Sequence, residues 1–120
     1  MTVPEPNPRL VFTSLLDVWR SGDVRCVLEL VTDDYVGHML HLTEVDRSKE
    51  MYPARISQFR VENPGTSFRV VEQRELSDGL FSRLIATRGD GAHSYGMNQS
   101  RLVGSLIAEE WAVWSDWRRA

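Results

Sequence analysis

The chain has 120 residues, with 42% hydrophobic and 26% charged side chains and a formal net charge of −3. These values are typical of one globular domain, and we expect residues 1–7 to be a flexible N-terminal tail and residues 8–120 to be the domain. So small a charge gives no electrostatic reason to expect nucleic acid or a membrane surface as partner, and no apolar run approaches the roughly 20 residues of a membrane span. The one cysteine, Cys26, excludes an internal disulfide and favours a cytoplasmic location.

Two helices are predicted at the start of the domain. Asn7 and Pro8 mark the beginning of the first, as an N-cap followed by proline at the first helical position. Apolar residues between positions 12 and 19 then recur at i, i+3, i+4 and i+7, which is the spacing of an amphipathic helix. Asp23 is a cap for a second, short helix, in which the same spacing continues to Val31.

A short strand and a third helix follow. Residues 32–34 break the second helix, and residues 35–40 are predicted to be a strand. The third helix covers about residues 48–62. Pro53 removes a backbone donor and crowds the preceding turn, so this helix either begins near Met51 or is kinked.

The second half of the chain predicts a meander of four long antiparallel strands. Short glycine-containing turns separate these strands, as in β-hairpins. Helices first and strands last indicate an α+β fold with helices on one face of a curved sheet. Such a sheet leaves a cavity at its mouth, which is the default site for a small molecule. The strands cover about residues 67–76, 80–88, 93–103 and 106–116.

The stretch from Leu106 to Trp117 holds three of the four tryptophans, and the strand within it is predicted to lie centrally in the sheet. Because side chains of a strand alternate between its faces, two sets are expected to point in opposite directions. The first set is Leu106, Ala108, Glu110, Ala112, Trp114 and Asp116, and the second is Ile107, Glu109, Trp111, Val113 and Trp117.

Four segments, together with the order of the elements, carry a family resemblance. They are residues 19–23 (WRSGD), 33–38 (DDYVGH), 77–79 (SDG) and 103–116 (VGSLIAEEWAVWSD). The chain resembles the nuclear transport factor 2-like superfamily and, within it, the SnoaL-like, polyketide cyclase-like group. The resemblance implies a cone-shaped α+β barrel, in which three N-terminal helices pack on a strongly curved, mainly antiparallel sheet. Related proteins include cyclases, isomerases, dehydratases, epoxide hydrolases and non-catalytic binding modules, so the fold alone does not give the function.

The catalytic groups of this family are absent at the matching positions. The acid/base aspartate of the SnoaL-like pattern falls on Ala112, and its assisting histidine falls on Gln99. The arginine and aspartate of limonene epoxide hydrolase fall on Arg83 and Ile85, so that the arginine is kept and the carboxylate lost. Neither mechanism is therefore expected in its usual form.

Other polar groups are predicted to line the pocket instead. If Ala112 faces the cavity, Glu110 and Trp114 do so too, because side chains alternate along a strand. The family resemblance implies that His38, on the first strand, also lines the pocket. His38 would then be the catalytic acid or base, oriented by Glu110. The alternatives are a partly buried structural histidine and a salt-bridged glutamate. The remaining substrate-binding candidates are Trp19, Tyr52, Arg83, Tyr95, Met97, Gln99 and Arg101.

Two functions remain open on this evidence. One is a cofactor-independent cyclase, isomerase or dehydratase acting on a hydrophobic, oxygenated molecule such as a polyketide or terpenoid intermediate. The other is a non-catalytic module of the same fold that binds a small ligand or dimerises. The loss of the family's catalytic groups favours the module, whereas the expected pocket favours the enzyme.

Partners and cofactors follow from the same residues. A homodimer through the outer face of the sheet is expected, since Trp111, Val113 and Trp117 would otherwise be exposed there. No metal site is expected, because no set of His, Cys and carboxylate residues has a recognised ligand spacing. No cofactor is expected either, because the glycines at residues 89–91 belong to a hairpin turn and precede no helix.

Overall fold

The fold is an α+β arrangement of one curved sheet and three helical segments. A computed structural model describes residues 7–43 and 45–119; residues 1–6 of the expected tail lie outside that part. No helix in the described part is long and apolar enough to cross a membrane. The helices are α1 (Pro8–Ser21), η1 (Val24–Glu29) and α2 (Tyr52–Glu62). The strands are β1 (Val31–Met39), β2 (Arg47–Ser48), β3 (Ser67–Leu76), β4 (Gly79–Thr87), β5 (His93–Val103) and β6 (Leu106–Trp114).

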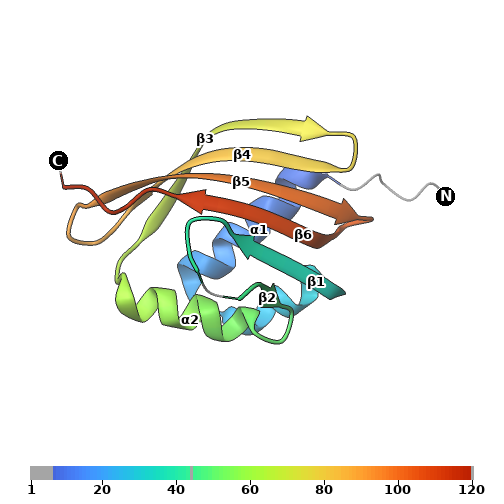
Figure 1. Cartoon of the computed structure of the whole chain (residues 1–120), viewed down its shortest axis with the longest axis horizontal. Coiled ribbons are helices and arrows are strands. Elements are labelled where there is room, and N and C mark those ends of the chain that lie inside the picture. Colours follow the sequence, from blue (N-terminus) through green and yellow to red (C-terminus); the bar gives the residue numbers. More distant parts are fainter. Residues whose placement is uncertain (1–6, 44, 120) are drawn as a thin grey trace.

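The sheet has the order β2-β1-β6-β5-β4-β3 (Figure 1). The meander from β3 to β6 is antiparallel, as predicted. Strand β1 lies beside β6 and runs parallel to it, so the last strand of the chain sits between the first strand and β5. Among the described residues the sheet is open, with β2 and β3 at its edges, and the expected barrel is therefore wrong.

The first helix forms as the sequence indicates. The side chain of Asn7 accepts hydrogen bonds from the backbone amides of Arg9 and Leu10, and Pro8 occupies the first turn. The helix ends at Gly22, whose φ of 82° is the left-handed conformation that glycine adopts without a steric penalty. This segment therefore folds from local signals.

The second predicted helix is replaced by a short 3-10 helix and an earlier strand. Asp23 makes no side-chain capping hydrogen bond, and the segment ends at Glu29. Strand β1 then begins at Val31, so residues 32–34, expected to break a helix, lie within a strand. The β-branched and aromatic residues of this stretch suit a sheet, and pairing with β6 outweighs the helical spacing. Helix α2 begins at Tyr52 with Pro53 in its first turn, which confirms the late start.

The core lies between the helices and one face of the sheet, here called the inner face. Helix α1 packs on β3 and β4, and α2 packs on η1. The opposite, outer face of the sheet is not covered by these helices. The buried core cluster comprises Phe12, Leu15, Val18, Val27, Val31, Tyr35, Tyr52, Ile56, Leu80, Leu84 and Ile107. The inner face is thus the face that can hold an enclosed site.

Candidate active site

A cavity of about 360 Å³ lies between the helices and the inner face of the sheet. Apolar and aromatic side chains from α1, α2 and the sheet form most of its lining. They include Phe12, Leu15, Trp19, Phe59, Phe68, Leu84, Ala112, Trp114 and Trp117. Cavities of this size and character bind small molecules, and the few polar groups in them fix orientation and chemistry.

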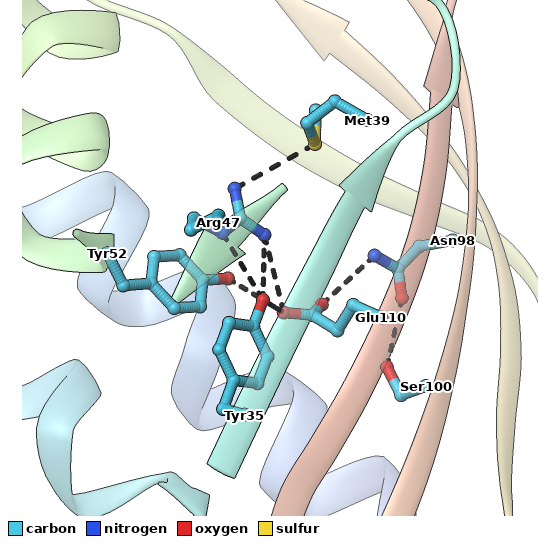
Figure 2. Close-up of polar contacts among 7 residues, drawn as sticks. All are labelled: Tyr35, Met39, Arg47, Tyr52, Asn98, Ser100 and Glu110. Atoms are coloured by element: carbon cyan, nitrogen blue, oxygen red, sulfur yellow. Dashed lines mark hydrogen bonds and ion pairs between the residues drawn. The ribbon is translucent and has the colours of Figure 1, made fainter. Parts of the chain in front are cut away.

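Glu110 is the buried carboxylate in this lining, and Figure 2 shows its polar contacts. Its Oε1 accepts hydrogen bonds from the hydroxyl of Tyr35 at 2.6 Å and from that of Tyr52 at 2.9 Å. Its Oε2 accepts one from Nδ2 of Asn98 at 3.0 Å. Asn98 is itself oriented by the hydroxyl of Ser100, which donates to Asn98 Oδ1 at 3.0 Å. The carboxylate is therefore held by neutral donors from three different elements.

Arg47 supplies the opposite charge. Its Nη2 lies 3.6 Å from Glu110 Oε1, and its Nε and Nη2 donate to the Tyr35 hydroxyl at 3.3 and 2.9 Å. The guanidinium also lies over the ring of Tyr52, at 3.9 Å from the ring centroid, which is a cation–π contact. Its Nη1 contacts only a thioether in this cluster, the Sδ of Met39 at 3.8 Å.

Gly37 leaves the space that this cluster needs. In the sheet register, Gly37 of β1 pairs with Arg47 on one side and with Glu110 on the other. A Cβ atom at Gly37 would lie 2.6 Å from the Tyr35 hydroxyl and 2.9 Å from Arg47 Nε. Any larger residue would therefore have to displace the contact between the phenol and the guanidinium.

Burial keeps both phenols neutral. It raises the pKa of Tyr35 far above its usual range, and the neighbouring Glu110 charge adds to this. Burial likewise raises the pKa of Tyr52, although Arg47 opposes the shift. Both hydroxyls are thus permanent hydrogen-bond donors at any physiological pH. Burial acts to lower the pKa of Arg47, but the surrounding Tyr52, Tyr35 and Glu110 outweigh it and raise this pKa, so Arg47 stays a cation.

The two oxygens of Glu110 have different surroundings. Oε1 faces the two phenols and the guanidinium, which occupy it with strong donors. Among the described residues, Oε2 has the Asn98 amide as its one side-chain donor. A carboxylate oxygen has room for about two hydrogen bonds. Oε2 is therefore the atom of Glu110 with remaining capacity to accept a proton from a molecule in the cavity.

Five of the residues predicted from the sequence line this cavity, and six do not. Those that line it are Glu110, Trp19, Tyr52, Ala112 and Trp114. Those outside the lining are His38, Arg83, Tyr95, Met97, Gln99 and Arg101. Trp117, expected on the outer face, also lines the cavity.

A β-bulge explains why the prediction on β5 was wrong. Leu102 pairs with Ile107, but Arg101 pairs with Glu109, so β6 has one extra residue, Ala108, at this point. A regular hairpin would have placed Gln99 opposite Glu110, on the inner face. The shift brings Asn98 opposite Ala112 and turns Gln99 to the outer face opposite Trp111.

The expectation that His38 faces the cavity is also wrong. It pairs with Trp111 in the register of β1 and β6, and its ring stacks on that of Trp111 on the outer face. Its Nε2 lies 2.7 Å from Glu109 Oε2, and its Nδ1 lies 2.9 Å from Asp46 Oδ2. The hydrogen bond with Glu109 raises the pKa of His38 and lowers the pKa of Glu109. His38 thus belongs to an ion-pair cluster away from Glu110.

Three residues of the site escaped the sequence reasoning. Tyr35 shares a face of β1 with Gly37 and Met39, and this alternation was a usable signal. Asn98 faces the cavity because of the bulge in β6, and no residue type in the sequence indicates that bulge. Arg47 lies between the strand predicted at residues 35–40 and the helix predicted at about residues 48–62, and nothing local distinguishes it from an exposed arginine. No group of three or more His, Cys, Asp or Glu residues that could hold a metal ion occurs in the described part of the chain.

Comparisons with solved structures agree with this architecture. IdmH from Streptomyces antibioticus, a proposed polyketide cyclase, superimposes with a TM-score of 0.78 at 19% identity, covering 92% of this chain and 93% of that one. A proposed polyketide cyclase from Acidithiobacillus ferrooxidans gives 0.78 at 13% identity, covering 97% and 92%. An NTF2-like protein of unknown function from Mesorhizobium loti gives 0.71 at 18% identity, covering 94% and 97%.

These likenesses establish the nuclear transport factor 2-like fold for this chain. At such low identities they establish the fold alone. No protein-family model and no curated protein matches the sequence. The function must therefore be argued from the cavity and from the residues around Glu110.

Proposed function

We propose that this protein is a SnoaL-like enzyme that performs cofactor-independent acid/base chemistry on a small, hydrophobic, oxygenated molecule. The class of reaction is a cyclisation, isomerisation or dehydration, and a polyketide or terpenoid intermediate is a suitable substrate. The observation that carries this proposal is a buried carboxylate, Glu110, in the wall of a largely apolar cavity. Two of the similar structures belong to proposed polyketide cyclases, which supports the same class.

Glu110 takes the role of general base in this proposal. Its Oε2 accepts a proton from the substrate, while the Tyr35 and Tyr52 hydroxyls keep Oε1 in place. The apolar lining excludes water from the bound substrate, so the proton passes between substrate and carboxylate. Asn98, which is oriented by its contact with Ser100, donates to Oε2 and fixes the position of this oxygen.

Glu110 also replaces the missing family aspartate in position. It lies two residues before Ala112 on β6, and both line the same cavity. A carboxylate on the inner face of this strand is thus kept, displaced by one repeat of the pleat. In this proposal Glu110, and not His38, is the catalytic acid or base, and His38 lies on the outer face of the sheet.

The test is turnover of a panel of neutral aromatic and polycyclic ketones, followed by mass spectrometry and absorption. The informative variant is Glu110→Gln, which keeps the shape of the side chain and removes the base. We expect a fall in kcat of at least about 100-fold. The matched control is Glu109→Gln on the outer face, which should leave kcat within about twofold of the wild type. Unchanged turnover in Glu110→Gln would refute the proposed function.

One observation favours a second candidate, the non-catalytic ligand-binding module. Among the described residues, every buried side-chain nitrogen and oxygen has a hydrogen-bond partner. A buried ion pair with all its partners in place is also what a purely structural network looks like. In that case ligands would bind without conversion, and Glu110→Gln would change stability while leaving ligand affinity unaltered.

We propose in addition that the protein forms a homodimer through the outer face of the sheet. Tyr95 and Met97 of β5 are 54% and 47% exposed there. They lie beside Trp111 and Val113 of the neighbouring strand, which are only partly buried. Contiguous apolar side chains on a sheet are unfavourable in water, and a second copy of the same face would cover them.

A further inference from the structure

We infer that Arg47 is the group that binds the substrate's oxyanion, and that the substrate is an uncharged carbonyl compound that reacts through its enolate. This inference rests on the proposed function, because it assumes that Glu110 removes the proton. Among the substrate-binding candidates predicted from the sequence, Tyr95, Gln99 and Arg101 do not line the cavity and so cannot take this role.

The contacts of Arg47 leave one end of its guanidinium for a ligand. Nε and Nη2 are directed to the Tyr35 hydroxyl. Nη1 contacts the sulfur of Met39 at 3.8 Å, and a thioether is a weak acceptor. Both Arg47 and Met39 line the cavity. A carbonyl or enolate oxygen is a much better acceptor for Nη1 than this sulfur, so it can take the place of the sulfur contact.

The charges of the site also indicate that Arg47 binds the oxyanion. The side chains of Arg47 and Glu110 are 5% and 2% exposed, so each depends on the other for neutralisation. When Glu110 is protonated, Arg47 becomes a buried cation without its carboxylate, and such a charge is costly. An enolate formed next to Nη1 restores the neutral pair.

The step balances in atoms and charge. The C–H bond next to the carbonyl breaks, and its proton forms an O–H bond with Glu110 Oε2. The C–H electron pair becomes the carbon–carbon π bond, and the carbonyl π pair moves to the oxygen. The site begins as carboxylate, guanidinium and neutral substrate, and it ends as carboxylic acid, guanidinium and enolate.

This exchange of counterions selects the substrate class. An anionic substrate would meet the existing charge of Glu110, and a cationic one would not need Arg47. A neutral ketone or 1,3-dicarbonyl compound suits the site both before and after the proton moves to Glu110. The other titratable groups that line the cavity are His41, Arg55, Glu62 and Asp116.

Substituted naphthols test the inference directly, because they resemble an enolate when ionised and their absorption and fluorescence distinguish the two forms. We expect the wild-type protein to bind a naphthol as naphtholate at a pH where the free compound is neutral. Calorimetry in two buffers of different ionisation enthalpy should show little proton release, because Glu110 retains the proton.

Three variants separate the contributions. Arg47→Met should bind the naphthol as the neutral form, with affinity about 10- to 100-fold lower. Arg47→Lys should retain the naphtholate spectrum, because it retains the charge. Glu110→Gln should still bind naphtholate but release about one proton to the buffer. The matched control is Arg55→Met, which removes another cation of the cavity lining and should leave the spectrum of the bound ligand unchanged.

The outcomes distinguish this inference from the proposed function. Neutral naphthol bound to wild-type protein, or naphtholate retained in folded Arg47→Met, would overturn the role of Arg47 while leaving Glu110 as the base. Turnover unaffected by Glu110→Gln would overturn the proposed function itself. If Arg47→Met does not fold, as judged by near-ultraviolet circular dichroism, the wild-type spectrum and the proton count of Glu110→Gln decide the matter.

Discussion

The ion pair between Arg47 and Glu110 makes a quantitative prediction about stability. Replacing Glu110 by Gln keeps the side-chain shape but leaves the buried guanidinium uncompensated. Replacing Arg47 by Met leaves the carboxylate uncompensated in the same way. Breaking a buried pair from one side costs about 3–5 kcal/mol, which is a large share of the roughly 5–15 kcal/mol that stabilise a typical domain.

The double variant should recover much of this loss. At the observed 3.6 Å separation, an effective dielectric constant of about 20 gives an attraction of roughly 4–5 kcal/mol between the two charges. In Arg47→Met/Glu110→Gln neither charge is left alone. The Asn98 amide can turn over to suit the new Gln, because the Ser100 hydroxyl can accept as well as donate. We expect a coupling energy of about 3–4 kcal/mol.

Urea unfolding near neutral pH, followed by tryptophan fluorescence and far-ultraviolet circular dichroism, measures the four free energies of the cycle. The matched control is the pair of Lys49 and the fully exposed Asp33, whose Nζ and Oδ1 lie 2.9 Å apart. Its cycle, Asp33→Asn with Lys49→Met, should give a coupling within the error of measurement, because solvent screens it. If the losses for Arg47 and Glu110 add to within about 0.5 kcal/mol, the reasoning about their buried charges is wrong.

Four further changes have defined outcomes. Gly37→Ala should lower the free energy of unfolding in urea by about 1–3 kcal/mol, because its methyl group enters the ion-pair cluster; an unchanged value would contradict the packing. The raised pKa of His38 means that its pairing with Glu109 stabilises the fold fully below about pH 6.5 and is lost as pH rises through that raised pKa. Because the pKa of Glu109 is lowered, the contribution of Glu109 to stability is lost as pH falls through that lowered pKa. His38→Gln should remove the loss of unfolding free energy on the alkaline side, as measured by urea titrations at a series of pH values. Ala112→Phe should fill the cavity and weaken naphthol binding more than tenfold by fluorescence, with little change in melting temperature. Met97→Glu should give a monomer by light scattering at micromolar concentration, and a monomeric wild type would refute the dimer.

Local signals in the sequence were enough to predict most of the fold. The meander from β3 to β6 was predicted because strand alternation and glycine turns are local features. The start of α1 was predicted from Asn7 and Pro8 for the same reason. The beginning of β1 at Val31 was missed, because its pairing partner Ile107 lies at the far end of the chain. Helical spacing there competes with a contact that no local pattern reveals.

The site was predicted less well, because it depends on which face each strand turns inward. Alternation divides β1 into two sets of side chains but does not say which set is buried. The set containing Tyr35 and Gly37 faces inward, and His38 faces outward. On β5, one extra residue in the partner strand exchanges the two faces and replaces Gln99 by Asn98. Glu110 was correctly predicted to face the cavity, because it lies two residues from Ala112 on the same strand. That inference does not depend on how the strand pairs with its neighbours.

The position of β6 has a consequence for the synthesis of the protein. This strand is made after the other five strands of the sheet, yet it lies between β1 and β5. While the ribosome is still translating, β1 has no neighbour on that side, and Arg47 has no carboxylate. A chain that stops before Leu106 would contain two separate sheet fragments, each with an unpaired edge, and such edges promote aggregation. The folded state therefore becomes available only when translation has passed β6, and incomplete chains of this protein should be insoluble.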